Sequence, residues 1–281
     1  MKQQYHIRRM QAEELQIAID WAQQEGWNPG LHDAETFYQA DPDGFFIGDL
    51  DHQIIAVGSA VRYDQHFAFC GLYIVHPDFR GQGYGLQLTQ ERLRYVAPRN
   101  AGIDGVVENI SIYERIGYRL AYHNMRYQGL AREAKFDQNA ILALSAINFA
   151  DLVAYDRLCF PAPRDTFLRA WIEQADSRAI AYVKQGKLMG YAVRRQCDEG
   201  HKIGPLFADS FEIARHLLNS LQQDIIGDCI FVDITDINPA AKRLVEQQKM
   251  QEVFSTGRMY LNGQPSLDDE KIFAITTFEL G

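Results

Sequence analysis

Residues 80–85 read "RGQGYG" and place three glycines and an arginine between an apolar run and a segment with helical periodicity. A turn in that position exposes backbone N–H groups at the start of a helix, where the helix dipole adds partial positive charge. Glycine lacks a β-carbon, so an anion can come close to the backbone, and Arg80 adds a positive charge suited to phosphate oxygens. The pattern predicts a phosphate-binding turn, and a flexible surface loop is the structural alternative.

Two common phosphate motifs do not fit this turn. A P-loop needs a lysine followed by Ser or Thr after its last glycine, whereas Gly85 is followed by Leu86 and Gln87. A dinucleotide fingerprint needs G-x-G-x-x-G, and the spacing here is G-x-G-x-G, although Asp104 lies about where a ribose-binding acid is expected. Strands also precede the turn, whereas a dinucleotide-binding unit usually opens with it, so this interpretation is disfavoured as well.

The elements around the turn alternate between strands and helices. Residues 67–75 form an apolar run that predicts a strand in the sheet interior, and residues 84–96 have helical spacing. That helix has one face that we expect to pack on the sheet, made of Leu86, Thr89, Leu93 and Val96. The other expected elements of the first half are a strand at 5–10, helices at 12–24 and 33–40, two strands within 45–63, a strand at 101–106, a short helix at 109–117 and a strand at 118–129.

The second half of the chain repeats this order. Residues 130–140 are charged and polar, which predicts a linker. After it we expect helices at 148–158 and 165–174, a hairpin at 179–195, a strand at 202–207, a helix at 210–223, a strand at 229–234, a helix at 240–250 and final strands. A period of roughly 140 residues is too long for a solenoid and indicates a duplicated domain. We therefore predict two domains, residues 1–132 and 133–281.

Composition narrows the class of protein. The chain has 281 residues, of which 47% are hydrophobic and 23% charged, as in ordinary globular proteins. Its formal net charge of -9 argues against a general nucleic-acid binder. No segment resembles a signal peptide or a membrane span, which predicts a cytoplasmic protein without membrane partners. Metal ligation is not expected, because the histidines and the four cysteines lack metal-ligand spacing: Cys70, Cys159, Cys197 and Cys229.

The turn at 80–85 and the segment "IYERIGY" at 112–118 follow a known spacing. Arg80, Gly83 and Gly85 fit a pattern of arginine or glutamine, two residues, glycine, one residue, then glycine or alanine, and "HPDF" precedes them. With the later tyrosine motif, they resemble the GNAT superfamily of N-acetyltransferases. "GPLFADS" and "KIFAITTFELG" are similar to a bacterial subgroup with a second, divergent GNAT-like domain. The resemblance implies an α/β fold of tandem domains, each with a central mixed, mostly antiparallel sheet flanked by helices.

The resemblance also implies acetyl-CoA as the acyl donor. In this family the strand that bears Tyr73, Ile74 and Val75 splays from its neighbour, and the pantetheine arm pairs with the freed backbone as an added strand would. The turn would hold the pyrophosphate through Arg80, Gly81, Gln82, Gly83, Tyr84, Gly85 and Leu86. Asn109 is a further candidate for donor binding, although it lies four residues before Tyr113 and the family usually has its asparagine seven before.

The candidate catalytic residues follow from the same resemblance. Tyr113 matches the tyrosine that often protonates the departing CoA thiolate, and an aromatic packed between helix and sheet is the structural alternative. The ammonium of an acceptor must also lose a proton, and the family does not fix the base. The candidates are Glu25 and Asp33, which flank the turn "GWNPGLH", and Glu108, and each is otherwise a surface carboxylate. Trp27 and Tyr38 are candidates for the wall of an acceptor pocket.

The second half lacks a comparable phosphate turn. The corresponding residues 208–210 read "ADS", and a carboxylate at Asp209 would repel a pyrophosphate. We therefore expect one CoA site, in the first half, and an acetyl-CoA-dependent N-acetyltransferase that transfers directly to a primary amine of a small molecule. The alternatives are a non-catalytic acyl-CoA-sensing module and a protein or peptide N-acetyltransferase. The sequence leaves open the acceptor and the choice between monomer and homodimer.

Overall fold

The computed structural model describes residues 4–281. Its first half has the predicted order of strands and helices, with short 3-10 turns between them. The elements are β1 (Tyr5–Arg9), η1 (Ala12–Glu14), α1 (Leu15–Gln24), α2 (Asp33–Ala40), β2 (Phe45–Leu50), β3 (Gln53–Ser59), β4 (Val61–Arg62), β5 (Phe67–Cys70), β6 (Ile74–Val75), η2 (Pro77–Phe79), α3 (Tyr84–Val96), β7 (Asn100–Val106), η3 (Val107–Asn109), α4 (Ile110–Ile116) and β8 (Arg119–Leu130).

The second half repeats much of this order. Its elements are η4 (Gln138–Ala140), β9 (Ile141–Ala143), η5 (Leu144–Ala146), α5 (Phe149–Cys159), α6 (Asp165–Glu173), β10 (Ser177–Lys184), β11 (Lys187–Gln196), β12 (His201–Ala208), α7 (Phe211–Leu221), β13 (Cys229–Thr235), α8 (Pro239–Gln247), β14 (Gln251–Tyr260), η6 (Asp269–Lys271) and β15 (Ile272–Ala274). Among the residues that the structure describes, no helix combines the length and the apolar character needed to cross a bilayer.

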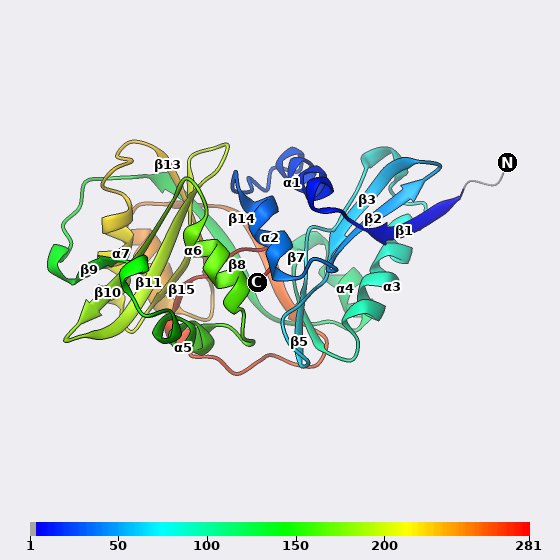
Figure 1. Cartoon of the computed structure of the whole chain (residues 1–281). Coiled ribbons are helices and arrows are strands. Elements are labelled where there is room, and N and C mark those ends of the chain that lie inside the picture. The colour runs from blue at the N-terminus through cyan, green and yellow to red at the C-terminus, as the bar shows by residue number, and fades with distance from the viewer. Residues whose placement is uncertain (1–3) are drawn as a thin grey trace.

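Two sheets carry these strands. The smaller sheet has the order β1-β2-β3-β6, and the larger sheet has eleven strands along the path β4-β5-β7-β14-β8-β13-β12-β11-β10-β9, with β15 paired to β12. The pairs β5–β7 and β12–β13 are parallel, and most other neighbours are antiparallel. Helices flank the sheets, and the two halves lie side by side (Figure 1). The predicted α/β fold with a mixed, mostly antiparallel sheet is confirmed.

Each half supplies a strand to the sheet of the other half. β14 lies between β7 and β8 and pairs antiparallel with both, so that Gly257 is opposite Gly105 on one side and His123 on the other. β8 in turn lies between β14 and β13. Figure 1 shows β8 and β14 in the middle of the molecule. The domain boundary at residues 132 and 133 stays a prediction, and the hydrogen bonds of the larger sheet run across it.

The strands β5 and β6 separate in the first half. β5 pairs with β7 over Phe67–Cys70, and β6 then pairs with β3 in the other sheet. Between them Leu72 adopts a φ of 44°, a left-handed conformation that redirects the chain. The prediction of one continuous interior strand over 67–75 is therefore wrong. Its first part pairs in the larger sheet and its last part pairs in the smaller sheet. β6 and the last residues of β7 are left apart.

The corresponding gap in the second half is filled by the chain itself. β12 and β13 pair over His201–Ile203, and beyond this β15 pairs with β12 while Ile275 N–H donates to the carbonyl of Asp233 at 2.9 Å. Gly204 makes this approach feasible, because a β-carbon there would lie 2.6 Å from the carbonyl oxygen of Ile275. In the second half, β15 thus fills the gap that stays open in the first half.

The helix predicted after the glycine turn is present as α3, with a different buried face. Leu88, Arg92 and Val96 are buried, whereas Leu86 is 56% exposed. The expectation that Leu86 packs on the sheet is therefore wrong. Thr89 and Leu93 border the open gap together with Leu86, whereas Val96, the fourth residue of the predicted face, is buried in the core as expected.

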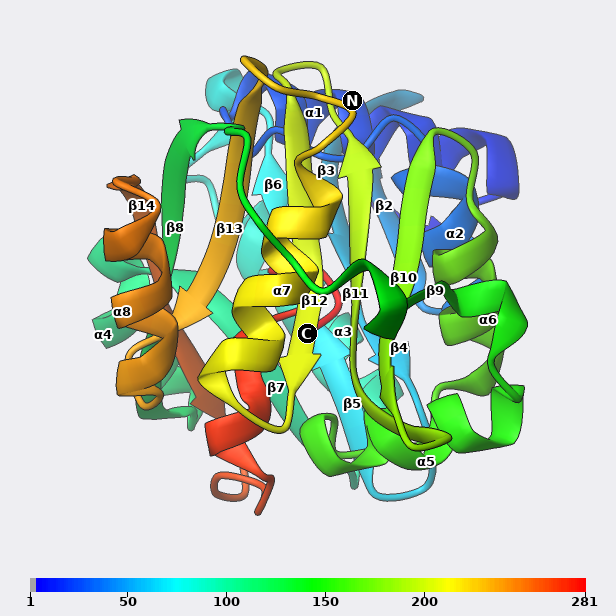
Figure 2. The same cartoon turned by 90° about the vertical axis from the view of Figure 1, so that its left-hand side faces the viewer.

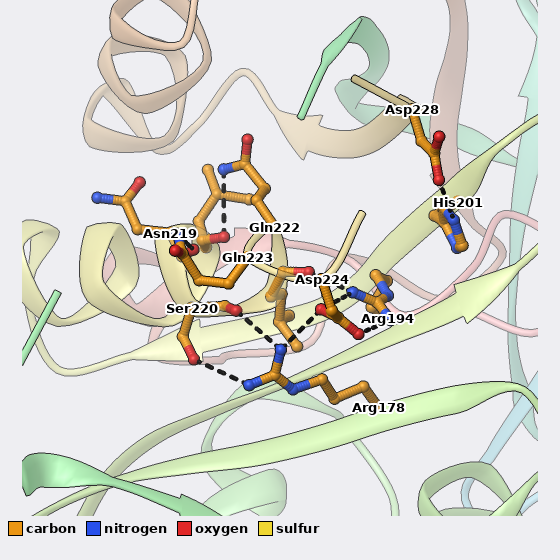
Figure 3. A network of polar contacts seen from close by, with 11 residues as sticks. Arg178, Arg194, His201, Asn219, Ser220, Gln222, Gln223, Asp224 and Asp228 are labelled. Carbon is orange, nitrogen blue, oxygen red and sulfur yellow. Dashed lines mark hydrogen bonds and ion pairs between the residues drawn. The ribbon is translucent and has the colours of Figure 1, made fainter. Parts of the chain in front are cut away.

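Helix α7 covers β11 and β12 in the second half (Figure 2). Its buried apolar residues are Ile213, Ala214, Leu217, Leu218 and Leu221. Just after the helix, the carboxylate of Asp224 accepts hydrogen bonds from Arg178 at 2.8 Å and from Arg194 at 2.7 and 2.9 Å, and Arg178 also donates to the carbonyl of Ser220 (Figure 3). Cations at a helix C-terminus complement its dipole, so this network anchors α7 to β10 and β11.

Candidate active site

A cavity of about 450 Å³ lies where β6 and β7 separate, and we call it the β6–β7 cavity. Strands β6 and β7, helices α3 and α4, the turn between β6 and α3, and residues of the second half form its walls. It brings together ten of the residues that the sequence predicted for the donor site: Tyr73, Ile74, Val75, Arg80, Gly81, Gly83, Gly85, Leu86, Asn109 and Tyr113.

The backbone of the 80–85 turn has the conformation that its glycines favour. Gly81 and Gly83 have φ values of 75° and 86°, which side chains other than glycine adopt only under strain, and Gly83 is the N-cap of α3. Gly85 is needed for a different reason, because a β-carbon there would overlap the hydroxyl of Tyr73. The turn therefore presents open backbone and the N-terminus of a 13-residue helix at the cavity.

Arg80 joins the turn to the strand before it. Its Nε donates to the carbonyl of Val75 at 2.8 Å, and its Nη2 forms an ion pair with Glu25. Both side chains of this pair are partly exposed, at 48% and 32%, so the pair contributes little stability and phosphate oxygens can compete for the guanidinium. Arg80 is thus positioned at the cavity without being locked into a buried interaction.

Two residues of the predicted turn point their side chains elsewhere. The side-chain amide of Gln82 donates to the carbonyl of Asp78 at 3.1 Å. The ring of Tyr84 packs against that of Tyr5, with centroids 4.8 Å apart. Their side chains lie outside the cavity lining, so Gln82 and Tyr84 contribute backbone to the turn.

Tyr113 lies on α4 and lines the cavity. Its ring covers Gly105 of β7, where a β-carbon would overlap the ring, so the small residue opposite is required. Burial raises the pKa of the phenol, and the positive charge of Arg92 partly opposes this effect. The hydroxyl is therefore protonated at neutral pH and can act as a proton donor. Asn109 is the N-cap residue of α4 and also lines the cavity.

The predicted base candidates lie in three different environments. Glu25 lines the cavity at its rim, as the partner of Arg80. Glu108 is exposed and lies outside the cavity lining. Asp33 is fully buried away from the cavity, where it accepts hydrogen bonds from Arg195 Nε at 3.0 Å and from the backbone N–H of Gly30 at 2.7 Å. Asp33 thus serves the contact between the two halves.

The two aromatic candidates for the wall of an acceptor pocket lie in different places. Trp27 lines the cavity. Tyr38 packs in the core of the first half, stacked on Phe45 with centroids 6.2 Å apart. Of the two, the structure brings only Trp27 to the site.

Two family models match the chain, in separate ranges. The model described as the acetyltransferase (GNAT) family matches residues 9–118, and the model described as the acetyltransferase (GNAT) domain matches residues 152–274. The chain belongs to the GNAT family. The resemblance drawn from the glycine turn and from the second half is thereby confirmed, and the chain is a GNAT transferase with a second GNAT-like domain. Enzymes of this family take their acyl group from acetyl-CoA or another acyl-CoA.

Curated relatives agree with this assignment. The GNAT chain is 28% identical over 270 residues to the holothin acyltransferase of Pseudoalteromonas sp. (strain SANK 73390), covering 96% of this chain and 92% of that protein. It is 24% identical over 155 residues to YitH of Bacillus subtilis (strain 168), which is named as an uncharacterized N-acetyltransferase, covering 54% and 55% of the two chains.

Solved structures share the fold of the GNAT chain. A Pyrococcus horikoshii protein described as a candidate acetyltransferase superposes with a TM-score of 0.85 at 19% identity, covering 99% of this chain and 96% of that one. A GCN5-related N-acetyltransferase from Sphaerobacter thermophilus has a TM-score of 0.59 at 15% identity, covering 91% and 95%. These similarities establish the architecture of the whole chain.

The second half of the GNAT chain supplies part of the cavity wall. Phe254 and Thr256 come from β14, and Phe278 and Glu279 come from the C-terminal segment. The rings of Phe254 and Phe278 meet edge to face, with centroids 5.9 Å apart. Sequence reasoning missed all four residues, because no local motif marks a strand that crosses to another half.

Asp104 also lines the cavity, and its carboxylate is fully engaged. It accepts hydrogen bonds from Arg258 at 3.0 and 2.7 Å, from Asn124 at 2.8 Å and from Thr256 at 3.3 Å. These partners lie on β14 and β8, so Asp104 ties the exchanged strands to β7. A carboxylate held in this way is not available for a ribose, which counts against the dinucleotide alternative.

A cluster of buried charges lies behind the cavity, between the two halves. Arg126 of β8 forms two hydrogen bonds to Asp233 of β13, at 2.7 and 2.8 Å. Lys202 of β12 donates to the carbonyl of Trp27 at 2.9 Å, and burial together with the charge of Arg126 lowers its pKa. No local motif reveals this cluster, because Arg126 lies more than 70 residues from both Lys202 and Asp233 along the chain.

Proposed function

We propose that this GNAT protein is an acetyl-CoA-dependent N-acetyltransferase that transfers the acyl group directly to a primary amine of a small molecule. The observation that carries the proposal is the β6–β7 cavity, where the 80–85 turn, the separated strands and Tyr113 meet. The turn would bind the pyrophosphate, since backbone N–H groups and Arg80 converge there. The edge of β6 that faces away from β3 would pair with the amides of the pantetheine arm.

Direct transfer is supported by the state of the thiol in the cavity. Cys70 lines it and is buried, and burial raises the pKa of its thiol. A thiol that stays protonated is a poor nucleophile, so an acyl-cysteine intermediate is disfavoured. The acceptor amine would attack the thioester itself, and the hydroxyl of Tyr113 would protonate the CoA thiolate as it leaves.

One relative bears on the choice of acyl group, and the residues of the cavity wall bear on the choice of acceptor. The relative that covers most of this chain is named as an acyltransferase, so donors with acyl groups other than acetyl belong in the same assay. The aromatic wall formed by Trp27, Phe254 and Phe278 favours an acceptor with an apolar body. A small amine fits a cavity of about 450 Å³ better than a protein segment does.

Calorimetry on a matched pair of glycine variants tests the donor site. Gly83→Ala and Gly186→Ala both place a β-carbon at a positive φ, 86° and 76°, with open space around it among the described residues. Each should cost about 1 kcal/mol of stability. Gly83 lies in the turn and Gly186 in the β10–β11 hairpin, so only Gly83→Ala should weaken acetyl-CoA binding, by about tenfold.

The stoichiometry in the same experiment decides the number of sites. The wild-type chain should bind close to one acetyl-CoA, because β15 fills the gap of the second half. Two per chain, or equal effects of the two variants, would contradict the assignment. Release of CoA thiol with a panel of amines then separates an enzyme from an acyl-CoA sensor, which would bind the donor without turnover.

A further inference from the structure

Glu279 is a buried carboxylate with an unsatisfied oxygen at the wall of the β6–β7 cavity. The residue is 2% exposed and lines the cavity. Its Oε2 accepts a hydrogen bond from the hydroxyl of Thr277. Its Oε1 is buried and has no hydrogen-bond partner among residues 4–281. An unpaired buried oxygen is costly, so its presence at a cavity calls for a function.

The backbone places Glu279 at the point where the donor strand begins to separate. Its carbonyl oxygen occupies the space that a β-carbon would fill at Gly71, the first residue after β5. Arg92 donates to the carbonyl of the same glycine at 3.1 Å, which holds this segment in place. Residues 71–75 then run from Glu279 towards the 80–85 turn. If the phosphates lie at the turn and the arm follows residues 73–75, the thioester end lies beside Gly71 and Glu279.

The charges around Glu279 come from four elements. Burial raises the pKa of Glu279, with Asp33 of α2 adding to the effect, while Lys202 of β12, Arg126 of β8 and Arg195 of β11 oppose it. A carboxylate with a raised pKa binds a proton more firmly than an exposed one and is a stronger base.

Among the cations around Glu279, Lys202 opposes the rise in its pKa most strongly. Asp33 is already paired with Arg195, and Asp233 with Arg126. Lys202 donates to a backbone carbonyl and forms no ion pair with a carboxylate among the described residues. The charge of Lys202 therefore favours the ionised form of Glu279, and Glu279 in turn raises the pKa of Lys202, while burial lets the carboxylate take up a proton more readily.

We propose that Glu279 accepts the proton from the ammonium group of the acceptor amine. This inference rests on the proposed function and assigns the base that the sequence left open. It also gives the second half a chemical role in a reaction whose donor site lies in the first half.

The step balances without any further reagent. The ammonium proton moves to Glu279, and the nitrogen lone pair then forms the C–N bond with the thioester carbonyl. As the C–S bond breaks, the thiolate takes the phenolic proton of Tyr113, and the second proton of the nitrogen restores that phenol. The proton on Glu279 returns to solvent, so the products are the amide, CoA thiol and one released proton.

Kinetics of Glu279→Gln test the proposal, with acetyl-CoA as donor and benzylamine, glucosamine and lysine as acceptor probes. The substitution keeps the size of the side chain and removes the base. We expect kcat at pH 7 to fall by about a hundredfold, KM for acetyl-CoA to stay within twofold, and the acidic limb of the kcat–pH profile to disappear. Glu270→Gln changes an exposed carboxylate of the same segment and should match the wild type.

A spectroscopic titration gives a second readout that needs no acceptor. Infrared difference spectra between pH 4 and 8 should show a protonated-carboxyl band whose midpoint lies above the ordinary value of about 4.3 and which is missing in Glu279→Gln. Unchanged kcat and an unchanged acidic limb in Glu279→Gln would overturn the inference while the proposed function stood. If none of the three amines reacts, the spectroscopic titration alone decides. A wild type without the protonated-carboxyl band would then overturn the inference. Failure of the wild type to bind acetyl-CoA would instead overturn the proposed function itself.

Discussion

Tyr113 shows how a single side chain depends on its surroundings for its chemistry. A glycine opposite its ring lets it lie close to β7, and burial keeps its hydroxyl protonated. The same reasoning applies to Glu279. Burial raises the pKa of its carboxylate, and one carboxylate oxygen is left without a partner and can accept a proton. At this scale the proposed acid and the proposed base face one cavity from different halves of the chain.

Tyr113→Phe tests the role of the acid. The ring keeps its contact with Gly105, so the Kd of acetyl-CoA should stay within twofold, while kcat should fall by roughly a hundredfold because the thiolate loses its proton donor. In the wild type the raised pKa of Tyr113 predicts that activity is retained up to about pH 10 and is lost as the pH rises beyond it.

The control for this change is Tyr182→Phe, which removes a hydroxyl from β10 in the second half. Steady-state kinetics from pH 6 to 11 provide the measurement. If kcat of Tyr113→Phe stays within threefold of the wild type, the phenol is a packing residue and water protonates the thiolate.

At the scale of elements, the exchanged strands β8 and β14 determine the shape of the site. β14 brings Phe254 and Thr256 to the cavity, and β8 carries Arg126 to the buried cluster. Burial alone would raise the pKa of Asp233, but the charge and hydrogen bonds of Arg126 outweigh it, so the pKa is lowered. The ion pair therefore ties β8 to β13 in its ionised form.

Arg126→Met should destabilise the fold by about 3–5 kcal/mol at pH 7, because it leaves the charge of Asp233 buried and unpaired. In the wild type, the contribution of Asp233 is present above its unfolded pKa of about 3.9 and is lost as the pH falls through the lower folded value. In the variant, burial raises the pKa of Asp233 while Lys202 and Arg195 still lower it, so protonation should relieve part of the destabilisation as the pH falls.

Urea unfolding at pH 7 and pH 4.5 checks this prediction. Arg169→Met is the control, because it removes an exposed ion pair with Glu173 and should cost less than about 1 kcal/mol. A loss of stability that is the same at both pH values would show that packing of the Arg126 side chain, and not its charge, holds the strands together.

At the scale of the whole molecule, both halves contribute strands to the larger sheet, and they differ in whether one gap is filled. The first half leaves β6 and β7 apart and forms the cavity, whereas the second half places β15 in the equivalent gap. The two halves therefore share an architecture and differ in whether a strand fills this gap. The exchange of β8 and β14 makes each half incomplete without the other.

A fragment of residues 1–132 should fail to fold, because β7 and β8 lose the strand that lies between them and expose bare edges. Gel filtration and far-UV circular dichroism of the isolated fragment should show aggregation or an unfolded chain. The matched control is the full chain with a protease site inserted after residue 132. Once cut, it should elute as an intact complex, since both parts and all hydrogen bonds remain. A monomeric, folded fragment would contradict the dependence between the halves.

The local features of this protein could be predicted from its sequence. Glycines at positive φ, helix periodicity and the tyrosine motif act over a few residues. They predicted the 80–85 turn, α3, α4 and the position of Tyr113 at the proposed donor site.

Long-range pairing of strands and charges could be seen only in the tertiary structure. Nothing local in residues 67–75 shows that two sheets divide them, or that β14 crosses to the first half. Asp33 and Glu279 look alike as sequence, yet one is neutralised by Arg195 and the other faces a cavity with an oxygen unpaired. Partners more than 70 residues away made that difference, because burial and charge compensation exist only once the chain has folded.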